Sequence, residues 1–227
     1  MPAAISTSNL TTATSELRDD FATGSSSSTA QIGLLGWSTG TITTAATYSQ
    51  SAVSFPHLGI ERITTAATAA TGGTLFLGPG TIATIPSLAA NAGWSATWIF
   101  RLGQTVTTSF RVGFASTTTA TAPTSGVWLR YDTASSDTAF KVECINSSAS
   151  TVGGTTYTVD TNWHKIKMAS TTAGQVTFTF DNNAPQTITS NVPTAGLFPI
   201  MIMTTQAASA EFAEADFFAM KWRGLGR

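Results

Sequence analysis

The sequence has 227 residues, of which 42% are hydrophobic and 10% are charged, and its formal net charge is -1 at pH 7. A chain this close to neutral has no broad electrostatic field that would attract nucleic acid or an acidic membrane, so general DNA or RNA binding is excluded. The single cysteine, Cys144, excludes an intrachain disulfide and a thiolate metal cluster.

The N-terminal residues 1–18 are predicted to form an extended arm, and residues 19–227 a single domain. Up to Ser15 the chain carries no charged side chain, and Ile5 and Leu10 are its large apolar groups. Such a segment cannot bury enough surface to fold by itself. It is therefore either an ordered tail of the domain or an assembly arm that packs on a neighbouring subunit through Ile5 and Leu10.

Short alternating segments follow along the rest of the chain. In Trp94 to Leu102 every second residue is apolar, and residues 156–180 hold two more alternating runs joined at Ala173-Gly174. Such alternation is typical of antiparallel strands with one buried face. After N-terminal elements at 31–37, 55–63 and 74–78, strands are expected at 94–102, 110–114, 127–131, 140–145, 164–168, 176–180, 198–203 and 215–222.

Turn residues separate these segments. They stand at Gly78-Pro79-Gly80, Asn91-Ala92-Gly93, Ala122-Pro123-Thr124, Gly153-Gly154, Asp181-Asn182-Asn183 and Pro193. No apolar run approaches the roughly 20 residues of a membrane-spanning helix, and the first residues lack the charged start of a signal peptide. We expect an all-β, two-sheet antiparallel sandwich, made in the cytoplasm as a soluble product without membrane insertion.

Four elements of the sequence follow one another in a distinctive order. They are an acidic-aromatic opening at 16–21, an Ile-Gly-x-x-Gly-Trp element at 32–37, a Pro-His-x-Gly element at 56–59, and the Trp163-His164 hairpin with its Asp-Asn turn. In this order they resemble the concanavalin A-like, laminin-G-like jelly roll of bacteriophage virion structural proteins. With the C-terminal strand, the resemblance spans most of residues 16–222.

The resemblance implies a non-enzymatic virion protein, a capsid decoration or head-fibre protein that attaches through its N-terminal arm. Its partners would be other virion proteins, the major capsid or tail subunits, and its location the virion. Because closed symmetry is the rule for such assemblies, a homo-oligomer is expected, a trimer in first place. The alternative is a carbohydrate-binding module, or a tail receptor-binding protein, that recognises host-surface glycans.

The acidic residues near the C-terminus do not match a catalytic pattern. On an extended strand Glu214 and Asp216 share one face and Glu211 lies on the other. Glycosidases of this fold need two carboxylates across one sugar, and the order Glu-x-x-Glu-x-Asp differs from their Glu-x-Asp-x-x-Glu. The C-terminal segment therefore predicts a structural strand and no catalytic residue.

The histidine, aspartate and cysteine residues also give no indication of a catalytic or metal site. No nucleophile motif surrounds His57 or His164, so structural roles are expected for both. Cys144 alternates with apolar residues and is expected to be buried. The aspartates lack the close spacing of a calcium loop, so no metal and no cofactor is predicted; they are Asp132, Asp137, Asp160 and Asp181.

Aromatic residues with polar neighbours are the candidates for a contact surface. Trp128 lies on the same strand face as Arg130, opposite Val127, Leu129 and Tyr131. That face is interpreted as plain packing, a subunit contact or a sugar site. The full set of candidate glycan or subunit contacts is Trp37, Trp128, Arg130, Asp132 and Trp163. The basic C-terminal residues Lys221, Arg223 and Arg227 are either a solvated end or a docking end for an acidic neighbour.

Overall fold

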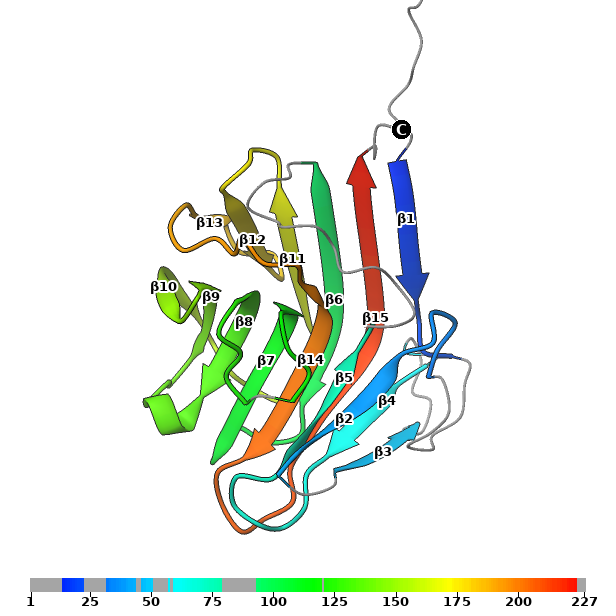
Figure 1. The fold of residues 1–227 in the computed structure, drawn as a ribbon. Coiled ribbons are helices and arrows are strands. Elements are labelled where there is room, and N and C mark those ends of the chain that lie inside the picture. The colour runs from blue at the N-terminus through cyan, green and yellow to red at the C-terminus, as the bar shows by residue number, and fades with distance from the viewer. Residues whose placement is uncertain are drawn as a thin grey trace, which may run out of the picture.

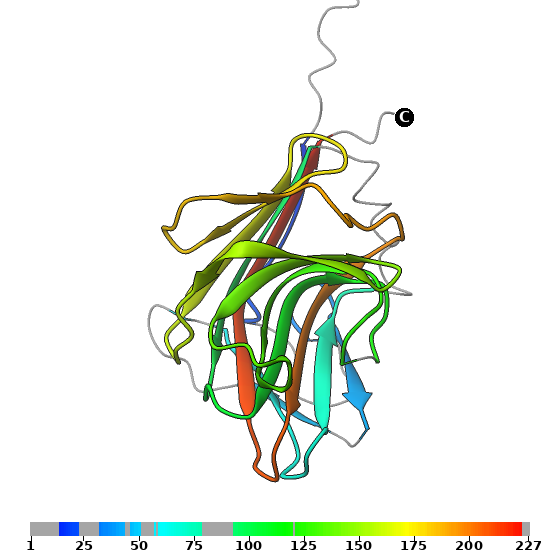
Figure 2. The ribbon, with the colours of Figure 1, turned by 90° about the vertical axis from the view of Figure 1, so that its left-hand side faces the viewer.

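A computed structural model describes residues 14–22, 32–43, 46–50, 57, 59–78, 93–119 and 121–223. Within them the chain forms two antiparallel sheets that lie face to face (Figures 1 and 2), which confirms the expected all-β sandwich. No helix in the described part is long and apolar enough to cross a membrane. A single 3-10 turn, Thr133–Ser135, interrupts the run of strands in these residues.

The eight-stranded sheet carries the Trp163-His164 hairpin towards one side and both ends of the described chain towards the other. Its path is β13 (Gln186–Ile188), β12 (Val176–Phe180), β11 (His164–Ser170), β6 (Trp94–Leu102), β15 (Phe212–Arg223), β4 (Glu61–Thr64) and β3 (Thr47–Gln50), and β1 (Thr14–Asp19) also pairs with β15. The first residue of β1, Thr14, is opposite Arg223 at the end of β15. The two ends of the described chain therefore leave the sheet side by side (Figure 1).

The seven-stranded sheet forms the second layer. Its order is β10 (Ala149–Tyr157), β9 (Phe140–Asn146), β8 (Gly126–Asp132), β7 (Thr108–Ala115), β14 (Phe198–Thr205), β5 (Gly72–Phe76) and β2 (Ser38–Ile42). β7 and β14 are buried on both faces. This sheet therefore carries buried side chains outside the sandwich core as well as inside it.

Alternation in the strands builds the core between the sheets. On β6 every second residue from Trp94 to Leu102 is buried, and the residues between them are half-buried. Trp98 packs against Trp37 and Phe218, with ring centroids 5.3 and 4.8 Å away. Cys144 also lies in this core as expected, and burial raises the pKa of its thiol to about 12.

The structure differs from the sequence-based expectation at the start of the domain. Residues 14–18 were assigned to the arm, but they form most of β1, which pairs with β15 through six residues from Thr14 to Asp19. This segment is polar and alternates weakly, so its strand depends on the partner β15. Residues 1–13, with Ile5 and Leu10, lie outside the described part of the chain.

The prediction of a turn at Gly153-Gly154 was wrong. These residues lie inside β10, at a shift in the register between Val152 and Thr156. The turn comes earlier, at Ser147 and Ser148, whose positive φ angles of 50° and 71° close a two-residue hairpin between β9 and β10. Serine is sterically disfavoured at positive φ angles, so the sequence does not predict a turn at these two residues.

Candidate functional site

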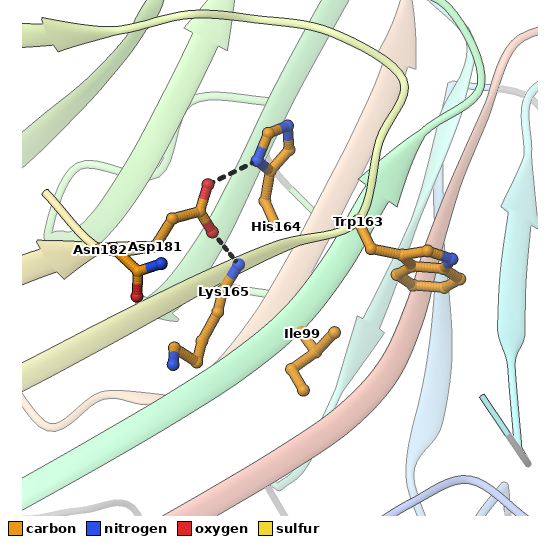
Figure 3. Close-up of a pocket in the computed structure, with 6 residues that line it drawn as sticks. All are labelled: Ile99, Trp163, His164, Lys165, Asp181 and Asn182. Carbon is orange, nitrogen blue, oxygen red and sulfur yellow. Dashed lines mark hydrogen bonds and ion pairs between the residues drawn. The ribbon is translucent and has the colours of Figure 1, made fainter. Parts of the chain in front are cut away.

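A hollow on the outer face of the eight-stranded sheet is the candidate site (Figure 3). It has a volume of about 390 Å³ and is lined by Ile99, Trp163, His164, Lys165, Asp181 and Asn182. The lining comes from β6, from the start of β11 and from the turn after β12. Ile99 lies opposite Lys165 in the β6–β11 pair, so the two strands form the floor of the hollow.

The turn after β12 is fixed by the carboxylate of Asp181. Asp181 has a positive φ of 47°, and its backbone N–H donates to the carbonyl of Lys165 at 2.7 Å. Asp181 Oδ1 accepts the backbone N–H of Lys165 at 2.7 Å, and Oδ2 lies 2.9 Å from His164 Nδ1. Both oxygens of Asp181 are thus engaged in joining the turn to β11 (Figure 3).

His164 lies between two carboxylates. Its Nε2 is 3.1 Å from Asp160 Oδ1, and its Nδ1 is near Asp181. Each ring nitrogen of His164 therefore has a carboxylate oxygen within hydrogen-bond distance. Partial burial would raise the pKa of Asp160, but hydrogen bonds from Asn162 and the charge of His164 hold it below its usual value. The structural role expected for His164 fits these contacts.

Trp163 forms the other end of the hollow. Its ring stacks on the imidazole of His57, with centroids 4.2 Å apart and an interplanar angle of 22°. His57 Nδ1 lies 2.7 Å from Asp216 Oδ2, and the guanidinium of Arg101 lies 4.9 Å from the Trp163 ring centroid. These contacts hold the half-buried indole in place beside Ile99.

The acidic residues near the C-terminus are engaged by side chains of the same domain. Glu214 is fully buried, accepts from Arg62 Nε at 2.8 Å and also accepts from Arg101 Nε. Glu211 lies apart from it and accepts from the hydroxyl of Thr107 at 2.7 Å. A bulge between Ala215 and Phe217 carries Asp216 towards His57.

Three of the predicted contact residues lie together on the outer face of the seven-stranded sheet. Trp128 donates to Glu143 Oε2 at 2.7 Å and is 1% exposed. Arg130 donates to Asp137 and to Glu143, both at 2.9 Å. Asp132 pairs with Arg111 at 3.0 Å. Trp128 also packs in an apolar cluster with Phe198, Ile200 and Ile202. On this face the indole is therefore covered by side chains of the domain itself.

The remaining predicted residues are elsewhere. Trp37 is in the sandwich core, where its Nε1 donates to Asp19 Oδ2 at 3.1 Å. Lys221 pairs with Glu16 on β1 at 3.4 Å. The side chain of Arg223 and the whole of Arg227 lie outside the described residues. The five predicted contact residues therefore occupy three separate places, and of these Trp163 reaches the hollow.

Sequence reasoning missed Lys165, Asn182 and Ile99 as site residues. The signal was present in the hairpin alternation, which directs Lys165 outward, and in the Asp-Asn turn. No group of three or more His, Cys, Asp or Glu side chains in the described ranges is placed to hold a metal ion.

Comparisons with known proteins establish the fold. The family model described as SO2946-like, C-terminal domain, matches residues 56–214. The crystal structure of SO2946 from Shewanella oneidensis MR-1, a protein of unknown function, superposes with a TM-score of 0.66 at 15% identity, covering 98% of this chain and 96% of that one. A search of curated protein sequences finds no match.

Two further solved structures share the sandwich. The carbohydrate recognition domain of Emp47p gives a TM-score of 0.55 at 14% identity, covering 92% of this chain and 95% of that one. The β-glucanase of Bacillus licheniformis gives 0.56 at 12% identity, covering 90% and 97%. At these identities the likeness concerns the fold, which is the expected concanavalin A-like jelly roll of lectins and glucanases.

Proposed function

Because the chain belongs to the family of SO2946-like C-terminal domains, a jelly-roll family, we propose that it is a carbohydrate-binding module whose site is the hollow beside Trp163. The observation that carries the proposal is the combination of a half-buried indole with free polar groups in one hollow. Aromatic rings and a few placed polar groups are what concave ligand sites generally offer. The lectin named above supports the proposal through its fold.

The polar groups of the hollow suit hydroxyl-bearing ligands. The amide of Asn182 both donates and accepts hydrogen bonds, and the ammonium of Lys165 donates. Both side chains are exposed, whereas the Asp181 carboxylate is held by His164 and the backbone of Lys165. A sugar lying over Ile99 would reach Trp163 at one end and Lys165 and Asn182 at the other (Figure 3).

The test is a glycan array probed with the full chain and with Trp163→Ala. We expect the parent protein to bind a defined set of glycans and Trp163→Ala to lose them. Asn182→Ala provides a second variant whose exposed side chain can be removed without unfolding the domain, and it should weaken the same glycans. Leu34→Ala, at an exposed position outside the hollow, is the control. An array on which Trp163→Ala binds as the parent does would reject this site.

We propose that the role is binding without catalysis. What supports this is that Glu214 is fully buried between Arg62 and Arg101, and Asp216 is bonded to His57. A glycosidase needs one carboxylic acid and one carboxylate that can both reach the sugar. If the protein cleaved a polysaccharide and Glu214→Gln abolished the cleavage, the non-catalytic proposal would fall.

A virion structural role is the second proposal, as a capsid decoration or head-fibre protein, or a tail receptor-binding protein. The pairing of Thr14 with Arg223 supports it, since segments before β1 and after β15 leave at one end of the sandwich. On this proposal the uncharged residues 1–13 and the basic C-terminal residues dock on capsid or tail subunits. On this proposal the protein is a homo-oligomer, with a trimer first, and it is located in the virion.

Antibody-gold labelling of particles tests the virion proposal. Label over the head supports decoration, and label at the tail supports receptor binding. A protein lacking residues 1–13 should keep its fold and lose attachment. Particles without label, or a truncated protein that still decorates them, would reject the proposal, and light scattering would decide whether the protein is a trimer.

A further inference from the structure

We propose that the hollow beside Trp163 selects saccharides that carry an anionic group, a carboxylate or a sulfate, on the sugar. The inference rests on the proposed glycan-binding function and adds the class of glycan. It is carried by the charges of the described residues around the hollow, above all by two lysines on β11, Lys165 and Lys167.

Lys165 and Lys167 differ from the other cationic side chains of the protein. Of the lysine and arginine side chains that the structure describes, these two make no ion pair with a carboxylate. The ion-paired ones are Arg18, Arg62, Arg101, Arg111, Arg130, Lys141 and Lys221. In a chain with so few charges, most cations have a fixed partner, and the exceptions are adjacent to the hollow.

The two lysines present their charge on one side of the sheet. They alternate on β11 with buried residues, so both point outward, and both are exposed. Residues two apart on a strand are about 7 Å apart along it. Their neighbours on β6 are Ile99 and Thr97, which carry no charge. A strip of positive charge therefore extends from the hollow along β11.

The one carboxylate that lines the hollow, Asp181, is turned away from the ammonium of Lys165. Asp181 faces His164 and the backbone N–H of Lys165 with its two oxygens, and the ammonium of Lys165 points away from it (Figure 3). An anion beside Lys165 would thus meet the ammonium and the Asn182 amide on the side away from that carboxylate.

The charge alone would not make a specific site. An exposed ion pair contributes at most about 1 kcal/mol, so a free anion should bind weakly. A saccharide anion gains in addition the contact with the indole of Trp163 and the floor at Ile99. The arrangement thus favours a ligand in which a sugar ring and an anionic group are parts of one molecule.

The test compares oligogalacturonate with its carboxyl-reduced, neutral counterpart of the same length and linkage, by calorimetry on the full chain. We expect the acidic oligosaccharide to bind roughly tenfold more tightly than the neutral one, with the difference disappearing in high salt. A sulfated galactan in a third arm shows whether carboxylate or sulfate is preferred. The Lys165→Gln, Lys167→Gln double variant should bind both forms equally.

Lys221→Gln is the matched control. Lys221 lies on β15 of the same sheet, but it is paired with Glu16 and lies opposite Ser95, towards the other end of β6 from Ile99. Its replacement should leave the preference for the acidic form unchanged. A double variant that keeps the preference, or a control that loses it, would overturn the assignment to β11.

The remaining outcomes separate this inference from the proposed function. If both forms bind equally to the parent protein and both are lost in Trp163→Ala, glycan binding stands and the selection of acidic sugars is rejected. If neither form nor the sulfated galactan binds, the glycan-binding function falls and the inference with it. If duplex DNA competes as well as the acidic oligosaccharide does, the strip is an unspecific polyanion surface and the inference is rejected.

Discussion

Glu61 is a carboxyl group whose protonation is strongly altered by the fold. It lies on β4 with no exposed surface, and neither carboxyl oxygen has a hydrogen-bond partner in the described part of the chain. Desolvation by burial raises its pKa from 4.5 to about 7. A buried carboxyl without a donor favours its neutral form, because the charged form has lost its water.

This shift predicts a pH dependence of stability. The raised pKa means that the native state holds a proton that the unfolded state releases, so the free energy of unfolding falls as pH rises from about 4.5 to 7. At about 1.4 kcal/mol per pH unit, the loss is about 3 kcal/mol at most. In Glu61→Gln this contribution is absent. Urea unfolding of both proteins at several pH values measures the difference, and two parallel profiles would contradict it.

Two tryptophans form a matched pair for a second prediction. Trp128 and Trp94 are both buried, but Trp128 Nε1 donates to Glu143 at 2.7 Å and Trp94 Nε1 has no partner in the described residues. Replacement by phenylalanine removes similar volume from both sites. Trp128→Phe also takes a donor from a buried carboxylate, so we expect it to cost about 1–3 kcal/mol more. Equal losses in chemical denaturation would show that the hydrogen bond contributes nothing net.

At the scale of the element, β10 shows how a glycine can serve close packing between strands. A Cβ on Gly153 would be 1.6 Å from Gln186 Oε1 and 2.6 Å from Val142 Cγ2, whereas a Cβ on Gly154 would meet nothing within 4 Å. Gly153 therefore permits β10 to approach β13 and the core side of β9, while its neighbour is unconstrained.

The two adjacent glycines predict opposite results. Gly153→Ala should destabilise the domain by about 1–3 kcal/mol, because Val142 is buried and cannot move away freely. Gly154→Ala should be neutral or slightly stabilising, since alanine restricts the unfolded chain. Thermal unfolding of the two variants measures this, and similar melting temperatures would mean that β10 shifts at little cost.

How far the sequence predicts the elements depends on their burial. β6, β11 and β12 were predicted because one face is apolar and the other polar, which is the pattern that alternation detects. β3 and β10 were missed because they are mostly exposed and rich in threonine, serine and glycine. Such strands are stabilised by pairing with a neighbouring strand, and this pairing does not require a recognisable pattern in the strand's own sequence.

At the scale of the whole molecule, the site was harder to predict than the fold. Trp163 was identified as a candidate from its aromatic character, but Trp37 was included on the same grounds and lies in the core. Trp163 differs from Trp37 in lying beside a hollow. The hollow forms because the register between β6 and β11 brings Ile99 next to Lys165, and because the turn after β12 brings Asn182 to both. These are long-range relations, so composition and alternation cannot supply them.

The pairing of Thr14 with Arg223 also determines how the domain should respond to mechanical force. Tension between the two chain ends would peel β1 from β15 one hydrogen bond at a time, at low force. The hollow lies at the other end of β11, since Ser170 is opposite Trp94 and His164 opposite Phe100. A ligand held there and pulled against an anchor at the chain ends would load the bonds of β6, β11 and β15 together, in shear. Single-molecule pulling in the two directions should show a much higher rupture force through the hollow than between the chain ends.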